Sequence, residues 1–478
     1  MSFIKILSRL ANVKYFPLVL SLILIILFAA LPINSSSHFP IISDAWSATY
    51  YVDATNGNDA NSGLSPGEAW KLIARVNNSV FKPADYILFK RGEVWRETLI
   101  APSSGTDGQP ITFGAYSSGA KPRISGKGPT SNRRYCIRVN SKNYVSIDNI
   151  HTERASGDYA ENIYILKSSH ITVQNCESEY GGQSGIKTLD SPYCVIRNCV
   201  THHNYGTGIF AKQSNNILIT NCISNHNDYK GIDIEAEPDK EILNAIVEDC
   251  TSHDNKREGI DTDNAYGVII RRCNVYSNGS LSADFPGISI GNGTQNATIS
   301  YSIIHHNFNE GITIEQSGAN TGTKIYNDVF YGNGATNIYI KSNNTTIRNC
   351  VSMNAGKYLF SVPGGLGVTR TSSDYNLFYD SKDFKIVWNG TIYNSLIAFR
   401  TASSQDTHSK QSDPLFIDAP KGDFRVQNNS VVIDAGTDVG LNQDYDGKSV
   451  PKGGAPDIGV YEYQPVVPLS PPKNLRVN

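Results

Sequence analysis

Four acidic residues occupy matching positions in two similar Gly-Ile segments of the chain: Asp233, Glu235, Asp261 and Asp263. In a strand, side chains two residues apart point to the same face, and neighbouring strands lie about 4.8 Å apart. If the two segments are neighbouring strands, the four carboxylates form a square, which we call the carboxylate square. Stacked like charges repel one another, so the square requires a bound cation, raised pKa values or basic neighbours.

The chemistry that suits the carboxylate square is the handling of an acidic sugar. Oxygen-rich clusters suit Ca²⁺, so we expect all four carboxylates to bind calcium. Calcium would neutralise the carboxylate of a uronic-acid polymer, and a base would then remove the adjacent proton in a β-elimination. Lys212 is the preferred base and Lys187 the second, because both precede the square on the same face. Asp233 and Asp261 complete the expected catalytic set. Nearby carboxylates raise the pKa of a lysine, so the base role requires a metal that neutralises them.

Four further residues are expected to contact a polysaccharide substrate. Arg257 and Glu258 directly precede the second Gly-Ile segment, and Phe210 and Glu315 stand on the same outward columns as the square. Other interpretations stay open. Carboxylates about 5 to 9 Å apart also serve glycoside hydrolases as acid and base or nucleophile. The square can equally be a solvated row of ion pairs or a structural calcium site, and a non-catalytic glycan-binding or adhesin-like protein is the alternative outside the enzymes.

An internal repeat must position these residues. Gly-Ile or Asn-Ile units recur every 23 to 28 residues, with the isoleucines Ile163, Ile186, Ile209, Ile232, Ile260, Ile288, Ile312 and Ile338. Each repeat holds short β-rich runs between Asn, Gly and Ser turns, and a single coil cannot bury its own apolar face. The repeat therefore predicts an all-β parallel β-helix of stacked coils. The residues that lengthen the 28-residue coils are expected in loops at about 236–258 and 264–287.

Three residue types keep step with the repeat. Asparagines fall five residues after a Cys at Asn204, Asn227, Asn255 and Asn278. Cysteines share one phase at Cys176, Cys199, Cys222, Cys250 and Cys273. This recurrence favours a ladder of free thiols, although disulfides that involve Cys136 or Cys194 stay open in an exported chain. Histidines recur just before the asparagines, and their fixed phase favours packing at the turn over metal binding.

Motifs at the two ends of the repeat region carry a resemblance. Tyr50-Tyr51-Val52-Asp53 opens the region, and Asp413-Pro414-Leu415-Phe416 and Asp457-Ile458-Gly459 close it. With these motifs the chain resembles the right-handed parallel β-helix superfamily of pectate-lyase-like extracellular bacterial proteins. The resemblance covers nearly all of the chain after residue 48 and implies right-handed coils.

Within that superfamily, one stretch is similar to the family-nine pectate lyases. Glu258-Gly259-Ile260-Asp261 resembles their acidic calcium motif, with Arg257 where the motif has its first Asp. The strand that carries their catalytic lysine compares with residues 287–291, where Ser289 stands in place of the lysine. The leading hypothesis is a calcium-assisted lyase of an acidic polysaccharide, and a β-helix glycoside hydrolase is the nearest alternative.

The ends of the chain suggest export. A basic stretch with Lys5, Arg9 and Lys14 precedes an apolar run at 16–33, so residues 1–48 are expected to be a signal peptide or membrane anchor. We expect an N-terminal cap and first coils at 49–135, repeats at 136–355, closing coils at 356–464 and a Pro-rich linker at 465–478. The 478 residues have a net charge of −2, which argues against a nucleic-acid partner. An extracellular or cell-surface monomer that meets the membrane only through its N-terminal segment is expected.

Overall fold

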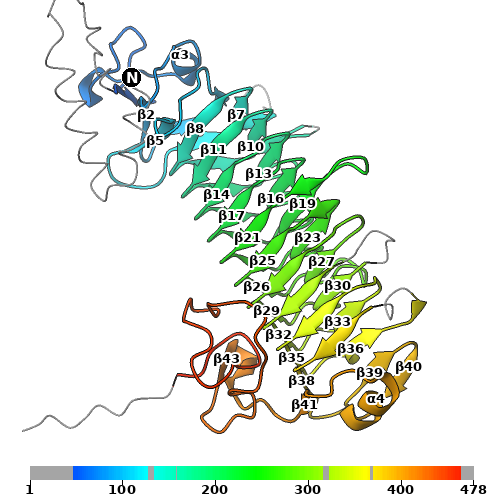
Figure 1. Cartoon of the computed structure of the whole chain (residues 1–478). Coiled ribbons are helices and arrows are strands. Elements are labelled where there is room, and N and C mark those ends of the chain that lie inside the picture. The colour runs from blue at the N-terminus through cyan, green and yellow to red at the C-terminus, as the bar shows by residue number, and fades with distance from the viewer. Residues whose placement is uncertain (1–46, 128–133, 158, 316–321, 366–369, 465–478) are drawn as a thin grey trace, which may run out of the picture. The chain divides into compact units, whose positions relative to one another are not determined.

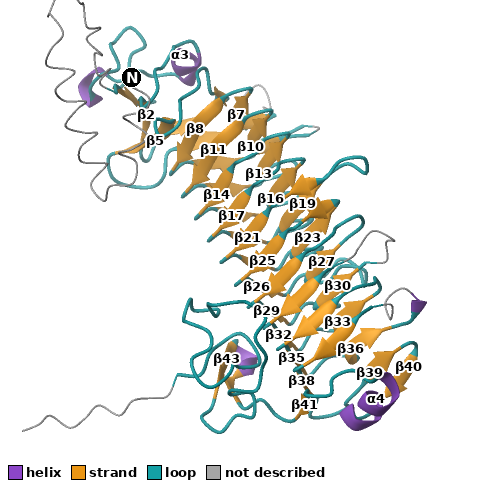
Figure 2. Ribbon diagram, viewed as in Figure 1, coloured by secondary structure: helices purple, strands orange, loops and turns teal. Residues whose placement is uncertain are grey.

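Stacked coils dominate the computed structural model, which describes residues 47–127, 134–157, 159–315, 322–365 and 370–464. In this part of the chain, three 13-stranded sheets run along the stack, and successive strands enter different sheets (Figures 1 and 2). Almost every strand pairs in parallel with the strand one coil away; the antiparallel pair of β39 and β40 ends one sheet. The prediction of an all-β parallel β-helix is confirmed.

The strands of the three sheets have the following bounds. Sheet A contains β1 (Thr49–Val52), β2 (Tyr86–Lys90), β5 (Ile111–Tyr116), β8 (Asn143–Asp148), β11 (Ser169–Gln174), β14 (Val195–Arg197), β17 (Leu218–Thr220), β21 (Ile246–Glu248), β25 (Ile269–Arg271), β28 (Thr298–Ser300), β31 (Lys324–Tyr326), β34 (Thr346–Arg348) and β37 (Ser372–Asp374). Sheet B contains β3 (Val94–Trp95), β6 (Arg123–Ser125), β9 (His151–Glu153), β12 (Glu177–Glu179), β15 (Val200–His202), β18 (Ile223–Asn225), β22 (Thr251–His253), β26 (Asn274–Tyr276), β29 (Ile303–His305), β32 (Val329–Tyr331), β35 (Val351–Met353), β38 (Leu377–Tyr379) and β41 (Lys410–Gln411). Sheet C contains β4 (Leu99–Ile100), β7 (Tyr135–Asn140), β10 (Glu161–Leu166), β13 (Ile186–Leu189), β16 (Ile209–Lys212), β19 (Ile232–Glu235), β23 (Ile260–Asp263), β27 (Ile288–Ile290), β30 (Ile312–Ile314), β33 (Thr336–Ile340), β36 (Tyr358–Val362), β39 (Ile386–Trp388) and β40 (Thr391–Tyr393).

The isoleucine repeat lies on the buried inner face of sheet C. Each isoleucine of the series from Ile163 to Ile338 pairs in register with the next, and all of them are buried. Because side chains alternate along a strand, the residue after each isoleucine points to the outer face of sheet C. The outer columns inferred from the sequence are therefore confirmed in register.

The asparagines form a hydrogen-bonded ladder at the turn between sheets B and C. Nδ2 of each residue donates to Oδ1 of the next at 2.9 to 3.1 Å along Asn204, Asn227, Asn255, Asn278 and Asn307. These side chains are fully buried, and the amide supplies both the donor and the acceptor that burial requires. All eight cysteines lie in the described residues, buried and free, as the ladder hypothesis predicted.

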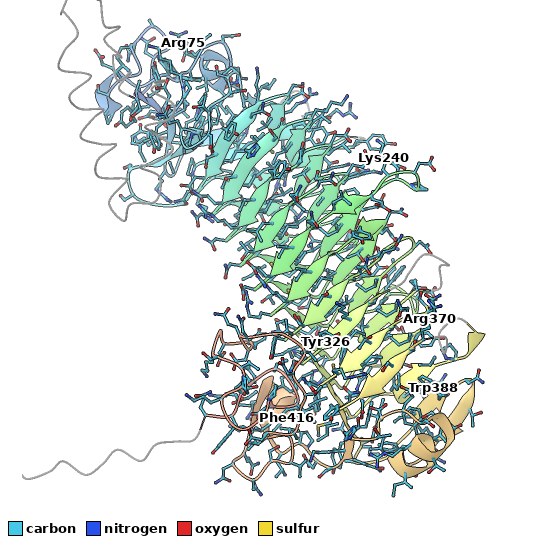
Figure 3. All side chains as sticks on the ribbon, in the orientation of Figure 1. Arg75, Lys240, Tyr326, Arg370, Trp388 and Phe416 are labelled. Carbon is cyan, nitrogen blue, oxygen red and sulfur yellow. The ribbon has the colours of Figure 1, made fainter. Side chains whose placement is uncertain are left out.

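The predicted loops are shorter than expected. Strands β20 (Ile242–Leu243), β21 and β22 lie within the range 236–258, and β24 (Ala265–Tyr266), β25 and β26 lie in the first part of 264–287. The extra residues of the long coils are instead at 236–241, after β19, and at 279–286, before β27. In Figure 3 the first of these loops, marked by Lys240, projects from the stack. The prediction was wrong in extent because β20 and β24 pair with each other and continue the coils.

Segments near both ends of the described chain cover parts of the stack. Helix α3 (Ile73–Asn77) contacts β4, and helix α4 (Leu396–Ser403) packs near β39 and β40. A hairpin of β42 (Phe416–Asp418) and β43 (Asp423–Val426) contributes Phe424 to a second apolar cluster with Val329, Val351 and Leu377 of sheet B. No helix in the described ranges is long and apolar enough to cross a membrane. The predicted signal or anchor and the predicted Pro-rich linker lie almost wholly outside those ranges.

Candidate functional site

The carboxylate square forms on the outer face of sheet C as the spacing predicted. Strands β19 and β23 pair in parallel, with Asp233 opposite Asp261 and Glu235 opposite Asp263. The square has a buried half and a partly open half. Asp233 and Asp261 are 2% and 4% exposed, whereas Glu235 and Asp263 are half-buried. A substrate on this face can therefore reach Glu235 and Asp263 more readily than the other two.

Lys230 neutralises the buried half of the square. Its Nζ lies 3.2 Å from Oδ2 of Asp233 and also forms an ion pair with Asp261. Burial opposes the charge of this lysine, but Asp233 and Asp261 outweigh burial and raise its pKa. The ammonium therefore remains charged between the two carboxyl groups.

The protonation of Asp233 is also shifted. Burial raises its pKa to about 8; Lys230 opposes that rise and Asp261 adds to it. Within the described chain, Oδ1 of Asp233 is buried with no hydrogen-bond partner. Two of the three remedies expected for stacked carboxylates, a basic neighbour and a raised pKa, are thus built into this chain.

The open half of the square pairs a carboxyl of raised pKa with a carboxylate in an ion pair. Burial, with Asp261 next, raises the pKa of Asp263 to about 7, and the backbone N–H of Asn292 opposes the rise. Asp263 leans over Gly291, where a Cβ would lie 2.1 Å from its Oδ1. Glu235, opposite, accepts an ion pair from Lys212 at 3.2 Å. The glycine thus leaves room for the carboxyl group that would titrate near neutral pH.

Arg257 and Glu258 border the buried half, as expected. The guanidinium of Arg257 lies between the rings of Tyr229 and Phe285, 4.0 and 4.1 Å from their centroids. Glu258 is buried, and burial together with Asp261 raises its pKa. The loops before β19, β23 and β27 thus supply the side chains that surround Lys230.

The two predicted bases lie beside a cavity on the preceding coils. Lys212 contacts Glu237 at 2.7 Å as well as Glu235; burial opposes its charge, but these partners raise its pKa. Lys187 lies 3.0 Å from Glu161 and 5.0 Å from the ring of Phe210. A cavity of about 550 Å³ is lined by Arg134, Tyr135, Tyr159, Glu161, Tyr164, Lys187, Leu189, Asp190, Lys212, Gln213, Glu237 and Lys240.

The remaining predicted contacts lie along the same face. Phe210 pairs in register with Asp233, so it borders the square directly. Glu315 follows β30, two strands beyond β23, and its carboxylate lies 3.2 Å from Nζ of Lys341. The structure brings Phe210 to the square and places Glu315 further along the stack.

Comparisons with known proteins agree with this architecture. The model of a family described as "Right handed beta helix region" matches residues 119–243 and 239–323. The chain has the right-handed β-helix fold of pectate-lyase-like proteins. A solved structure of pectate lyase Pel9A is similar with a TM-score of 0.60 and 19% identity, over 87% of this chain and 97% of that one. A complex of XylC with xylose is similar with a TM-score of 0.51 and 10% identity, over 71% and 86%.

One curated relative is also similar to part of this chain. A lacto-N-biosidase of Bifidobacterium longum subsp. longum is 29% identical over 135 residues, which are 27% of this chain. The match spans only 8% of that larger protein.

The side chains of this β-helix do not form a set of converging calcium ligands at the square. Nζ of Lys230 lies where an ion shared by Asp233 and Asp261 would lie. In the described ranges, the groups of at least three side chains whose ligand atoms converge do not include members of the square. Calcium binding by the square stays a prediction.

Lys230 is the site residue whose role the sequence did not reveal. It bridges two members of the square, Asp233 and Asp261. A signal was present in the repeat, because Lys230 and Glu258 directly precede the glycines that start the two acidic segments. Lys230 and Glu258 thus carry opposite charges at equivalent positions of neighbouring coils. This indicates that these loop residues face the same cluster of carboxylates as the strand residues.

Proposed function

We propose that this β-helix is a carbohydrate-active enzyme that cleaves glycosidic bonds in an acidic polysaccharide at the outer face of sheet C. The pairing of Asp263 with Glu235 carries the proposal. Asp263 has a pKa near 7 and is partly accessible, which suits a general acid. Glu235 faces it from the neighbouring strand in an ion pair with Lys212, which suits a base or nucleophile.

These two residues can divide the work of glycoside hydrolysis. Protonated Asp263 donates its proton to the glycosidic oxygen as the bond breaks. Glu235 then attacks the sugar or activates water, depending on how far apart the two carboxyl groups stand around the substrate. Neighbouring strands are about 4.8 Å apart, which is nearest to the spacing of about 5 Å in retaining enzymes. Burial contributes most to the raised pKa of Asp263, Asp261 adds to the rise, and Lys230 opposes it.

The cavity beside Lys212 supports an anionic substrate. Lys187, Lys212 and Lys240 line it, and ammonium groups bind sugar carboxylates or sulfates. Tyr135 and Tyr164 also line it, with ring centroids 5.2 Å apart, and such rings pack against sugar faces. The names of a pectate lyase and a lacto-N-biosidase among the similar proteins agree with a carbohydrate substrate.

Calcium-assisted β-elimination is the second candidate, and the lysines of the same cavity favour it. They are positioned to neutralise the substrate carboxylate, which makes the adjacent proton easier to remove. The raised pKa of Lys212 suits this neutralising role better than the role of base that the sequence suggested. Hydrolysis is preferred because the raised pKa of Asp263 suits a proton donor and the ion pair of Glu235 suits a carboxylate.

The products distinguish the two reactions. The purified protein is incubated with a panel of uronate polymers, with and without a chelator. Hydrolysis gives reducing ends without ultraviolet absorbance, whereas elimination gives unsaturated, absorbing ends. We expect reducing ends that do not depend on the chelator, and a rate about 10² to 10⁴ lower in Asp263→Asn and in Glu235→Gln.

The matched control is Asp284→Asn, which alters an exposed carboxylate in the loop 279–286 and should retain full activity. Full activity in both Asp263→Asn and Glu235→Gln would refute the proposed acid and base. Unsaturated ends that disappear with the chelator would establish the second candidate instead. Glycan retention on a column without either product would establish a binding protein.

A further inference from the structure

Aromatic and imidazole rings stack from coil to coil where the strands of sheet B end. His203 stacks on His226 with centroids 5.1 Å apart and planes 8° apart. Further along, His253 stacks on Tyr276 at 4.7 Å and 3°, and Tyr276 stacks on His305 at 5.0 Å and 21°. This stacking confirms that most histidines of the repeat pack at the turn, as their fixed phase indicated.

Two stacks meet at His226 and His253: His226 directly follows its sheet B strand, whereas His253 is the last residue of its strand. The rings of His226 and His253 lie 5.9 Å apart and nearly perpendicular, at 82°. Asp254 takes the position in its coil that His226 takes in the preceding one: each comes directly before a ladder asparagine, and each has a left-handed φ, of 54° and 51°. A carboxylate therefore replaces a ring among the residues that directly precede the ladder asparagines. It lies beside the imidazoles of two neighbouring coils.

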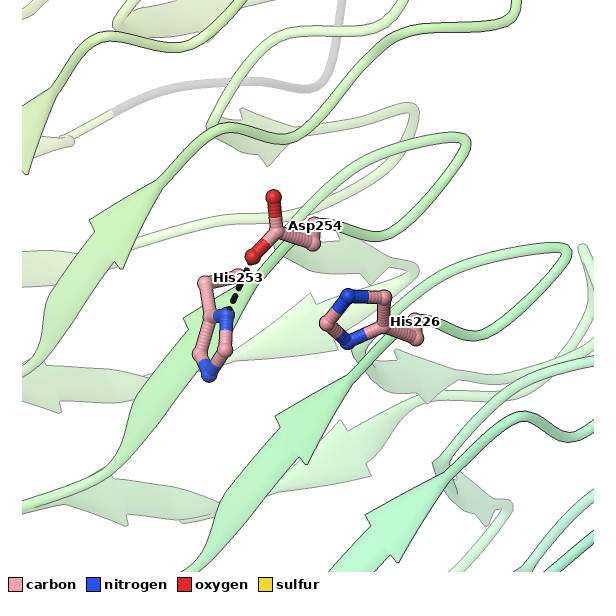
Figure 4. A group of neighbouring side chains, drawn as sticks. All are labelled: His226, His253 and Asp254. Atoms are coloured by element: carbon pink, nitrogen blue, oxygen red, sulfur yellow. Dashed lines mark hydrogen bonds and ion pairs between the residues drawn. The ribbon is translucent and has the colours of Figure 1, made fainter.

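The three side chains face a common point (Figure 4). One ligand atom of each of His226, His253 and Asp254 lies within 4.8 Å of the others. Nδ1 of His226 contacts Oδ1 of Asn225 at 2.8 Å. Because an amide oxygen only accepts, Nδ1 carries the hydrogen and Nε2 keeps its lone pair for another ligand. A hydrogen bond from the second ring nitrogen to an oxygen is how metal-binding histidines are usually oriented.

We propose that His226, His253 and Asp254 bind a divalent transition-metal ion of the zinc class. Two imidazole nitrogens and one carboxylate oxygen are ligands that zinc prefers, and they are a poor set for calcium. Nδ1 of His253 now lies 2.6 Å from Oδ2 of Asp254. The metal takes the place of the proton shared there, and that proton is released to solvent. Three protein ligands leave a coordination position for water.

A second convergent group, His151, Glu153 and Glu179, is the weaker candidate. Arg123 and Arg154 already pair with Glu153, at 3.7 and 3.6 Å. A metal there would have to compete with two guanidinium groups. His226 and Asp254 are exposed, and the ion pair and hydrogen bond described above leave their outer sides accessible.

The proposed ion would join the two neighbouring coils whose sheet C strands carry the carboxylate square. His226 is two residues before Asp228, and Asp254 is two before Lys256, where the loops to β19 and β23 begin. Those loops carry Lys230 and Arg257. Metal binding would therefore fasten the two coils whose loops surround the buried half of the square, and it would raise the thermal stability of the protein.

The test is a calorimetric titration of the full chain with zinc chloride, with cobalt absorption spectra as a second readout. We expect one high-affinity zinc per chain, with proton release. Asp254→Asn and His226→Asn should each weaken binding by at least about tenfold, the lower end of what loss of even an outer partner costs. Asn tolerates the left-handed backbone at both positions, so both variants should fold.

His306→Asn is the matched control, because His306 is exposed at the corresponding position of a later coil, with φ of 51°. It should bind zinc as the wild type does. Zinc should raise the unfolding temperature of the wild type and of His306→Asn, but not of Asp254→Asn. Unchanged affinity in Asp254→Asn and His226→Asn, or an equal loss in His306→Asn, would overturn the proposal.

Discussion

The asparagine ladder and the carboxylate square both stack like polar side chains on the same coils, yet the two stacks solve burial differently. In the ladder, each amide donates to the next and accepts from the one before, at 2.9 Å from Asn227 to Asn255. In the square, Asp233 and Asp261 can only accept when ionised, so the stack is repulsive without a proton or a cation. Lys230 and the raised pKa of Asp233 supply both.

This difference separates structural repetition from function. A ladder of amides stabilises every coil that continues it, so its recurrence needs no further explanation. A buried carboxylate pair stabilises nothing that an apolar pair could not, and sites of such conflict are typical of functional regions. Partly accessible Asp263, whose pKa lies near neutrality, stands next to this conflict. Substitutions in the carboxylate square and in the asparagine ladder test this difference.

Removing Lys230 should have the largest effect. Lys230→Met leaves Asp233 and Asp261 buried without their cation, which typically costs about 3 to 5 kcal/mol of unfolding free energy. Urea denaturation measures the loss. Lys212→Met, which removes a half-buried lysine from the same face, should cost less than about 1 kcal/mol. Equal losses of unfolding free energy in the two variants would mean that the buried carboxylates need their cation no more than the partly exposed ones do.

Breaking the ladder should cost less. Asn255→Ala leaves the buried amides of Asn227 and Asn278 each without one partner, at about 1 to 3 kcal/mol. The exposed Asn56, in the loop after β1, provides the control variant Asn56→Ala, with a change within about 0.5 kcal/mol. If Asn255→Ala proves as stable as this control, the ladder does not stabilise the stack as argued.

The sequence was sufficient for whatever the repeat itself imposes. The Gly-Ile register predicted the parallel strands of sheet C and the pairing of Asp233 with Asp261, because a one-residue shift would expose every isoleucine. The free thiols and the turn asparagines followed from the same phase.

Contacts made by non-repeating loops could not be read in this way. Asp233 pairs with Lys230, and Arg257 lies between two rings; both residues come from loops whose course no periodicity describes. The sequence therefore gave the correct register of the four carboxylates, but it assigned the catalytic role to Asp233 and Asp261. The structure divides the four carboxylates into a buried pair and a partly open pair, which moved the expected acid and base to Asp263 and Glu235.

The two stacks should also differ in pH dependence. The folded pKa values of Asp233 and Asp263, about 8 and about 7, lie above the ordinary value of 3.8. The folded state therefore binds more protons than the unfolded state between about pH 4 and 8, and stability falls as pH rises through this window. The double variant Asp233→Asn and Asp263→Asn should flatten that fall in urea denaturation.

The loss caused by Asn255→Ala should in contrast be the same at both ends of the window, because an amide does not titrate there. A fall of equal slope in the wild type and in the double variant would show that these two carboxyl groups are not the source.

The smallest effect is expected in the cavity beside Lys212. Lys240 lies on the exposed loop after β19 and lines the cavity. Its Nζ lies 3.1 Å from Oε1 of Gln213. Lys240→Gln should raise KM for an acidic polysaccharide about two- to fivefold at low salt and leave kcat unchanged, because a solvent-exposed charge acts at long range and is screened. Kinetics at two ionic strengths measure this, with the exposed Lys324→Gln on sheet A as the control.

The difference in KM between Lys240→Gln and Lys324→Gln should disappear at high salt. The loss of unfolding free energy in Lys230→Met should persist at high salt, since the ion pairs of Lys230 are buried. If high salt removes both the KM difference and the stability loss, the buried half of the square is not shielded from solvent. The contrast between the buried half and the open half of the square then fails.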